Sequence, residues 1–182
     1  MIEGIKHVRL CGFGGQGVIL AGTILGYAGV NDGKWVAGSN SYGAEARGGA
    51  CRADVIISDK PISFPHVIKA NILIAMYQRA YDRYIESVTN ENGMVIYDQQ
   101  MVDAREIPGL KQVGVPATST AIKELKNKQV SNIVMLGAAA EITGIVNRDA
   151  LITAIEKNVK ARFKKLNLKA VELGFSLGKV EA

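Results

Sequence analysis

Glycines gathered in two short stretches are the residues of this sequence best suited to binding chemistry. The first stretch, at residues 12–17, reads GFGGQG and contains the spacing G-x-G-x-x-G. Glycines let backbone N–H groups approach a ligand, and the N-terminus of a following helix adds partial positive charge, so a phosphate is one candidate ligand. The candidate ligand-contacting residues of this glycine loop are Gly12, Gly14, Gly15, Gln16 and Gly17.

A nicotinamide or flavin dinucleotide fits this loop poorly. Its ribose needs an acidic residue at the end of the second strand, but Asp32 precedes that strand, and Ser39 and Asn40 stand at its exit. No Gly-Lys-Ser/Thr follows, so the loop is not a Walker A motif. Three interpretations stay open: a turn that only packs a strand against a helix, a site for another phosphate, or a close approach to a partner subunit. Gln16 is the one side chain of the loop able to hydrogen-bond a ligand.

The second stretch reads SYGAEARGG and spans residues 41–49. It follows a predicted strand, at the edge where α/β sheets place their sites. Arg47 can bind a carboxylate or a phosphate with two parallel hydrogen bonds, or it can pair with Glu45 and hold the shape of its own loop. The residues expected at a ligand or an interface are Ser41, Tyr42, Gly43, Glu45, Arg47, Gly48 and Gly49.

No set of residues typical of catalysis is visible in the sequence. His7 and His66 each stand alone, and no pair of carboxylates has metal-like spacing. Cys11 and Cys51 form no C-x-x-C pair, so the chain cannot hold an iron–sulfur cluster or a structural zinc by itself. We expect both cysteines to be small buried side chains. These features predict a subunit or a binding module rather than a complete enzyme.

The net charge of +5 is concentrated in residues 157–169, which read KNVKARFKKLNLK. Lys and Arg recur there at helical spacing, which favours a solvated helix face; an anionic ligand, an acidic partner protein and nucleic acid are the alternatives. The apolar runs are too short for a membrane span, and the N-terminus lacks the apolar region of a secretory signal. We therefore expect a cytoplasmic protein that binds neither membrane nor nucleic acid.

Strands and helices are predicted to alternate along the chain. With 182 residues, 48% of them hydrophobic, residues 1–182 are expected to form a single domain with one core. The apolar patterns predict strands at residues 7–11, 34–37, 51–58, 71–76, 94–97 and 111–115. They predict helices at residues 18–30, 78–88, 118–125, 132–143, 148–159 and 163–177.

This order of elements is typical of the α/β class and predicts a three-layer α/β/α domain with a mostly parallel sheet. The sheet becomes mixed if the strand at 51–58 runs antiparallel to its predecessor, because a loop rather than a helix joins the two.

The two glycine-rich stretches together resemble one family. FGGQGV at 13–18, SYGAEARGG at 41–49 and RADVIISDKPI at 52–62 look like the gamma subunit of 2-oxoacid:ferredoxin oxidoreductases. The resemblance covers essentially the whole chain, and it implies the three-layer fold that the pattern of elements also predicts. In the family this unit is a separate chain or part of a larger polypeptide.

The resemblance implies a reaction carried by a complex. In the family a 2-oxoacid is oxidatively decarboxylated on thiamine diphosphate with Mg, electrons pass through iron–sulfur clusters to ferredoxin, and coenzyme A takes the acyl group. These cofactors belong to alpha and beta subunits and to a ferredoxin-like delta subunit. The present chain is then a non-catalytic gamma subunit that holds none of them alone and is inactive by itself.

The form SYGAEARGGAC looks most like the family members that act on 2-oxoglutarate. Pyruvate and branched-chain oxoacids rank next, because Ala44, where pyruvate enzymes often have proline, discriminates weakly. The two glycine-rich stretches are expected to face the alpha–beta core and to shape the approach of coenzyme A. The alternatives are a stand-alone nucleotide- or phosphate-binding protein that uses the Gly12–Gly17 loop, and a scaffold or nucleic-acid-binding module that uses the basic segment.

Overall fold

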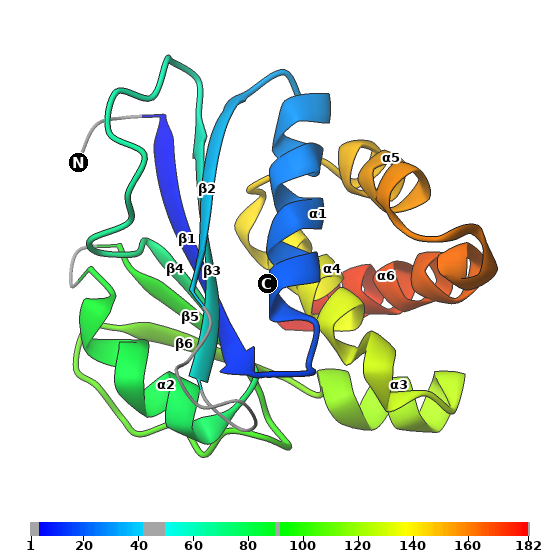
Figure 1. The fold of residues 1–182 in the computed structure, drawn as a ribbon. Helices are drawn as coiled ribbons and strands as arrows, with labels where there is room; N and C mark the ends of the chain where they lie inside the picture. The colour runs from blue at the N-terminus through cyan, green and yellow to red at the C-terminus, as the bar shows by residue number, and fades with distance from the viewer. Residues whose placement is uncertain (1–3, 42–49, 90–91, 182) are drawn as a thin grey trace.

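A computed structural model describes residues 4–41, 50–89 and 92–181. These residues form one six-stranded sheet in the order β2-β3-β1-β4-β5-β6 (Figure 1). The strands are β1 (Ile5–Phe13), β2 (Trp35–Ser41), β3 (Ala50–Ser58), β4 (Ile72–Ala75), β5 (Met94–Asp98) and β6 (Lys111–Val115).

The sheet is mixed. Strands β1, β4, β5 and β6 run parallel to one another, whereas β3 runs antiparallel to both of its neighbours, β1 and β2. Only residues 42–49 separate β2 from β3, and a parallel crossover needs a dozen or more residues, so β3 must return antiparallel. The expectation of a mixed sheet, conditional on this short connection, is confirmed.

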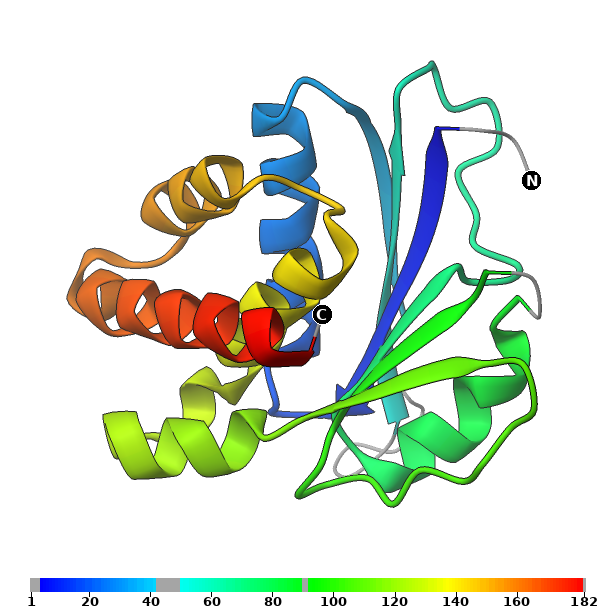
Figure 2. The same ribbon diagram turned by 180° about the vertical axis from the view of Figure 1, so that it is seen from behind.

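Helices cover both faces of the sheet, as Figures 1 and 2 show from opposite sides. The α-helices are α1 (Val18–Asn31), α2 (Gln78–Tyr84), α3 (Ala117–Leu125), α4 (Ser131–Thr143), α5 (Arg148–Asn158) and α6 (Ala161–Glu181). Short 3-10 turns lie at η1 (Ile85–Ser87) and η2 (Lys128–Val130). Helix α2 covers one face, and α1 and α4 lie on the other, with α5 and α6 packed outside them. The predicted three-layer α/β/α arrangement is confirmed, with one helical layer much thicker than the other.

Two hydrophobic clusters lie on the two faces of the sheet. The larger joins β1 and β3 to α1, α4 and α6, and the smaller joins β4 and β5 to α2. All four residues of β4 are buried, as its uninterrupted apolar sequence predicts. Helix α6 approaches α4 closely at Gly174, where a Cβ atom would lie 2.2 Å from the carbonyl oxygen of Val134.

The structure moves several predicted boundaries, among them those of β2 and α2. The strand predicted at 34–37 continues to Ser41, because Gly38, Ser39 and Asn40 remain paired with β3. A glycine followed by two polar residues is typical of a loop, but pairing with a neighbouring strand overrides such a local preference. The helix predicted at 78–88 ends at Tyr84 and continues as the 3-10 turn η1.

The prediction for the cysteines is confirmed, since Cys11 and Cys51 are both buried and free. Among the helices in the described part of the chain, none has the length and apolar character that crossing a bilayer would require.

Candidate functional site

The glycine loop joins the end of β1 to the start of α1, as predicted. It lies at the carboxyl end of β1, next to the end of β4, where the N–H of Met76 donates to the carbonyl of Cys11 over 2.9 Å. Gly17 precedes the first residue of α1 with a φ of 72°, a left-handed conformation that favours glycine. No side chain caps this helix end.

The side chain of Gln16 is turned into the protein. Its residue is only 8% exposed. Its Oε1 accepts a hydrogen bond from the N–H of Phe13 over 2.9 Å, and its Nε2 donates to the carbonyl of Met76 over 2.8 Å. In this structure both polar atoms of the Gln16 side chain hold the loop against the end of β4.

Two glycines of the loop serve packing. A Cβ atom at Gly12 would lie 2.4 Å from Oε1 of Gln16, so a side chain there would displace the carboxamide that holds the loop. At Gly17 a Cβ atom would lie 2.4 Å from Nδ2 of Asn132. That amide donates to the carbonyl of Gly17 over 3.0 Å, and it ties the loop to the first turn of α4. The absence of side chains at these two glycines therefore permits the close contacts that hold the loop against β4 and α4.

The other two glycines face open space. Gly14 and Gly15 are exposed, and a Cβ atom at either position would meet no other atom within 4 Å. Gly15 has a φ of 104°, which L side chains rarely adopt, whereas Gly14 has no such restriction. The backbone of Gly14 and Gly15 is therefore the part of the loop that another molecule can approach.

A cavity of about 380 Å³ opens beside this exposed backbone. Gly15, Gly17 and Leu20 form one wall, and segments around η2 and around the α5–α6 turn form the others. Lys160 and Phe163 stand among the lining residues, together with several Asn and Gln side chains. A lysine, amide groups and an aromatic ring can bind an anionic molecule that also has apolar or aromatic parts.

The ends of both glycine-rich stretches lie at the same edge of the sheet. Cys11 of β1 and Ser41 of β2 are both register partners of Arg52, on opposite sides of β3. Ser41 is exposed. The remaining candidates of the second stretch lie outside the described residues: Tyr42, Gly43, Glu45, Arg47, Gly48 and Gly49.

The strand topology agrees with the sequence argument against a dinucleotide. In a dinucleotide-binding βαβ unit the two strands are parallel neighbours, whereas here β3 lies between β1 and β2. Asp32 follows the last residue of α1, at the end of the helix far from the glycine loop. Its carboxylate accepts a hydrogen bond from the N–H of Asn147 over 3.2 Å.

Sequence reasoning missed a buried ionic cluster between β1 and β3. Arg9 and Asp54 are each 3% exposed, and Arg9 donates from Nε and Nη2 to the two carboxylate oxygens over 2.7 and 2.9 Å. Further donation from Arg9 to the carbonyl of Val67 and to Oγ of Ser87 ties β1 to the β3–β4 connection and to η1. The sequence does contain a sign of this pair, because each of two otherwise largely apolar strands has a charged residue in its middle.

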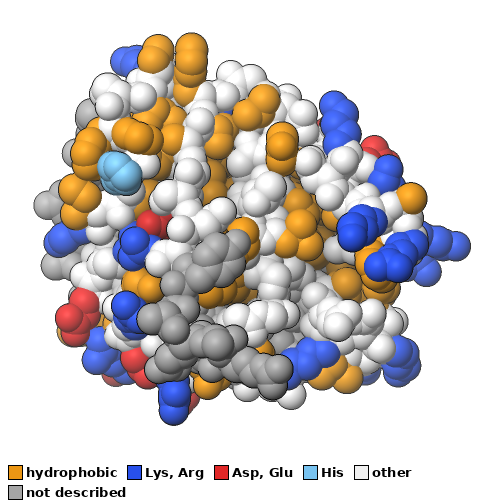
Figure 3. All heavy atoms as spheres, viewed as in Figure 1, with side chains coloured by type: hydrophobic (Ala, Val, Ile, Leu, Met, Phe, Trp, Pro, Cys, Tyr) orange, Lys and Arg blue, Asp and Glu red, His pale blue; other side chains and the backbone are white. Residues whose placement is uncertain are grey.

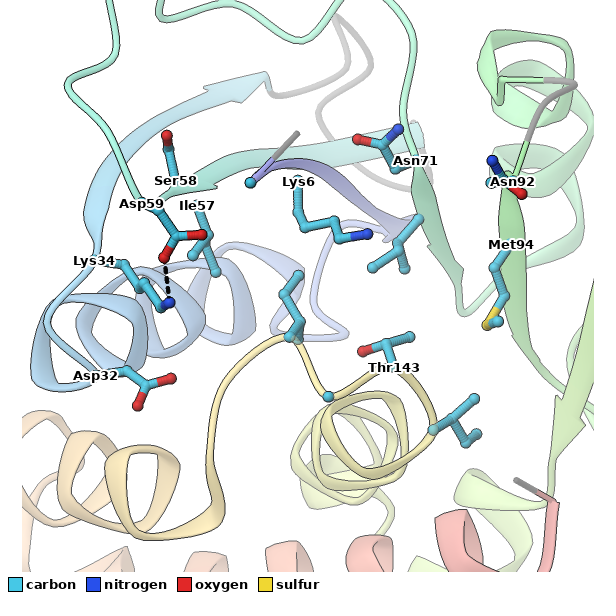
Figure 4. Close-up of a pocket in the computed structure, with 15 residues that line it drawn as sticks. Lys6, Asp32, Lys34, Ile57, Ser58, Asp59, Asn71, Asn92, Met94 and Thr143 are labelled. Carbon is cyan, nitrogen blue, oxygen red and sulfur yellow. Dashed lines mark hydrogen bonds and ion pairs between the residues drawn. The ribbon is translucent and has the colours of Figure 1, made fainter. Parts of the chain in front are cut away.

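A second cavity, of about 350 Å³, lies at the opposite edge of the sheet (Figure 4). Lys6 extends into it, and Lys34 pairs with Asp59 at its side. It contains none of the candidate site residues of the two glycine-rich stretches. Among the described residues no group of three or more His, Cys, Asp or Glu could hold a metal ion.

The basic segment at 157–169 forms the end of α5 and the start of α6. Its charged side chains are mostly exposed, including Lys157, Lys160, Arg162, Lys165 and Lys169. This agrees with the expected solvated helix face. The ring of Phe163, 43% exposed, lies under the guanidinium of Arg162 at 4.6 Å.

Similar proteins are known both by sequence and by structure. The chain is 43% identical over 177 residues to the 2-oxoglutarate synthase subunit KorC of Methanocaldococcus jannaschii, covering 96% of this chain and 94% of that protein. The KorC subunit of Methanothermobacter thermautotrophicus is 42% identical, with 97% of both chains covered.

Two solved structures share the fold with a TM-score of 0.87. One is the gamma subunit of a keto/oxoacid ferredoxin oxidoreductase from Geobacter sulfurreducens, 35% identical, with 98% of both chains covered. The other is a 2-oxoglutarate:ferredoxin oxidoreductase from Magnetococcus marinus, 23% identical, in which 99% of this chain matches 32% of the longer one.

The model of one protein family matches nearly the whole sequence, from residue 7 to residue 177. The chain belongs to the pyruvate ferredoxin/flavodoxin oxidoreductase family.

Proposed function

We propose that this chain is the gamma subunit of a 2-oxoacid:ferredoxin oxidoreductase that converts 2-oxoglutarate to succinyl-CoA and CO₂. The observation that carries the proposal is the end-to-end match to 2-oxoglutarate synthase subunits. Four such subunits are 37–43% identical to this chain, each over 94% or more of it. A pyruvate synthase subunit from Methanothermobacter marburgensis is 29% identical and a ketoisovalerate oxidoreductase subunit from the same organism 34%. We assign 2-oxoglutarate as the substrate because the 2-oxoglutarate synthase subunits have the higher identities.

The chemistry of decarboxylation and electron transfer is assigned to partner subunits. Cys11 and Cys51 do not suit an iron–sulfur cluster, because they belong to the hydrophobic clusters on opposite faces of the sheet. We therefore place thiamine diphosphate, Mg and the clusters on alpha, beta and delta subunits, with ferredoxin as the electron acceptor. We place this complex in the cytoplasm, and we treat residues 1–182 as one domain of it.

The glycine loop is assigned to the approach of coenzyme A, a co-substrate with phosphate groups. The exposed backbone of Gly14 and Gly15 allows a molecule to come close. The adjoining cavity is lined by Lys160 and by Gly17, which directly precedes the N-terminus of α1. The stretch 41–49 follows β2 at the same sheet edge. The residues present thus suit an anionic co-substrate held between this chain and its partners.

The experiment begins with the complex purified through a tag on this chain. Its partner chains are identified, and coenzyme A-dependent reduction of a viologen dye is measured with 2-oxoglutarate, pyruvate and 2-oxoisovalerate. We expect the highest kcat/KM with 2-oxoglutarate. A complex that prefers pyruvate would overturn the substrate assignment, and a lone chain carrying a nucleotide would overturn the subunit assignment.

The role of the loop is tested with Gly14→Ala in the same complex. This methyl group enters open space without backbone strain, so the variant should fold normally and yet hinder close approach. We expect a KM for coenzyme A raised severalfold, with the KM for the oxoacid unchanged. Gly26→Ala, inside α1 with its nearest neighbour at 3.6 Å, is the matched control and should leave both KM values unchanged. Wild-type kinetics for Gly14→Ala would contradict the assignment to coenzyme A.

A further inference from the structure

Helix α1 and strand β2 present a face without charged side chains. None of the 14 residues of α1 and none of the seven residues of β2 is Asp, Glu, Lys or Arg, although 21% of the whole chain is charged. The two charged residues between them are both engaged, Lys34 with Asp59 and Asp32 with Asn147. A solvated helix normally carries charges on its outer side, so α1 has the composition of a covered helix.

Large apolar side chains gather on this face. Leu20, Tyr27 and Val30 on α1 are 41–58% exposed, and they are three of the nine large hydrophobic residues that are exposed in the described part of the chain. A fourth, Trp35 at the start of β2, is 55% exposed beside the strand edge, on the face of the sheet opposite α1, because its neighbour Val36 packs against α1. In Figure 3 the atoms over α1 are largely orange and white, whereas the largest blue patch lies beyond it, over α5 and α6. Apolar patches of this kind mark binding surfaces.

Strand β2 leaves one edge of the sheet open. It is first in the strand order, and among the described strands it pairs with β3 alone. Natural proteins protect such edges with lysine, proline or a bulge, but β2 reads WVAGSNS and pairs with β3 in continuous register. A groove of about 270 Å³ runs between α1 and this strand, lined by Tyr27, Val30, Val36 and Gly38. The strand edge and the groove form one surface.

We propose that this surface binds a second copy of the chain, with β2 antiparallel to its own copy about a two-fold axis. Antiparallel pairing centred on Gly38 places Trp35 opposite Ser41 and Val36 opposite Asn40, so no charge meets a like charge. The two α1 rows then lie on the same side of the joined sheet and cover one another's apolar residues.

Charge argues for this occupant and against other ways of pairing two copies. The chain carries +5 overall, and residues 157–169 alone hold six basic and no acidic residues. Two copies therefore repel one another through α5 and α6. Pairing through α1 and β2 avoids this repulsion, because neither copy has a charged residue on these two elements. The inference is independent of the proposed catalytic complex, since it concerns the chain alone.

Trp35 makes the proposal directly measurable, because it is the only tryptophan of the chain and is 55% exposed. The molar mass of the purified full chain is measured by sedimentation equilibrium over a range of concentrations, with tryptophan emission recorded on the same samples. We expect the mass to double with rising concentration and the emission to shift to shorter wavelength with the same midpoint.

The diagnostic variant is Val30→Lys, at a site 58% exposed near the end of α1. Lysine is a good helix former, so the fold should survive, which circular dichroism verifies. Each dimer carries the added charge twice, and we expect dimerisation to weaken on the order of a hundredfold. Ile68→Lys, at a residue 73% exposed outside α1 and β2, is the matched control and should leave dimerisation unchanged.

A chain that stays monomeric at all concentrations would overturn the proposal. So would a dimer that Val30→Lys leaves intact. Emission of Trp35 that shifts only when the partner subunits are added would assign the face to one of them instead. The activity assay of the complex is not involved, so failure here is distinguishable from failure of the proposed function.

Discussion

Arg9 and Asp54 are register partners across the antiparallel strands β1 and β3, joined by two hydrogen bonds of 2.7 and 2.9 Å. Both residues are almost fully buried, and Tyr84 lies with its ring 5.3 Å from the Arg9 guanidinium. The pair fastens the middle of β1 to the middle of β3 on the α2 face of the sheet. It therefore fixes the relative position of the two strands that adjoin the glycine-rich stretches.

Replacing Asp54 by asparagine should destabilise the protein strongly. The change leaves the buried Arg9 guanidinium without a counter-charge, and breaking one half of a buried ion pair costs about 3–5 kcal/mol. Urea denaturation of the purified chain measures this loss. Arg52→Ala is the control: its Nε lies 3.5 Å from Asp54 and its side chain is 35% exposed, so we expect a loss of about 1 kcal/mol or less. Equal losses for the two variants would contradict the importance of the Arg9 pair.

Replacing Gln16 by alanine should loosen the glycine loop. It leaves the N–H of Phe13 and the carbonyl of Met76 without the partners that Gln16 supplies. Each buried group left unpaired costs about 1–3 kcal/mol. Gln16→Glu has the same shape but loses the donor to Met76, and its carboxylate repels that carbonyl. We expect Gln16→Glu to be destabilised at neutral pH and to recover part of the loss in mild acid, where a protonated carboxyl can donate.

Replacing Gly174 by alanine should push α6 away from α4. The added Cβ atom would lie 2.2 Å from the carbonyl oxygen of Val134 and 2.9 Å from the N–H nitrogen of Ala138, both rigid backbone groups. We expect a loss of roughly 1–3 kcal/mol in the free energy of unfolding. Gly26→Ala in α1 has room for the methyl group and should instead gain about 0.5–1 kcal/mol from helix propensity. Thermal denaturation of both variants checks the opposite signs.

Lowering the pH should destabilise the protein through His7. Partial burial lowers the pKa of His7, and a hydrogen bond with the backbone of Lys69 opposes this shift only in part. The unfolded histidine titrates near its ordinary value of about 6.5. The unfolded chain therefore binds more protons, so the free energy of unfolding falls as the pH drops from about 6.5 through the lower pKa of the folded state. His7→Gln should remove this part of the pH dependence. A titration of His7 by NMR at or above the ordinary value would contradict the prediction.

The two cysteines should be nearly inert in the folded chain. Burial raises the pKa of the Cys11 thiol and of the Cys51 thiol, so little thiolate is present at neutral pH. We expect slow modification by a thiol reagent at pH 8 and rapid modification of both groups in denaturant. Rapid modification of the native chain would show that one of the two β-strands opens near the loop.

The sequence by itself determined the elements whose pattern is local. The apolar run of β4, the strand at 111–115 and the start of α1 after the glycine loop are all read from periodicity and from glycine, and the structure places them as predicted. The motifs FGGQGV and SYGAEARGG also sufficed to point to the family. These features depend on neighbouring residues alone, which is why one sequence reveals them.

Tertiary structure alone decided the features that depend on distant partners. The hydrogen bond of the Gln16 side chain to Met76, 60 residues away, exists only in the folded chain. Ser39 and Asn40 are typical loop residues, but they form a strand because they pair with β3. Arg9 can be buried because Asp54 lies opposite it. In each case the deciding free energy comes from pairing or burial against a segment far along the chain. Local propensity does not depend on that segment, so only the folded arrangement of β1, β3 and β4 defines the site.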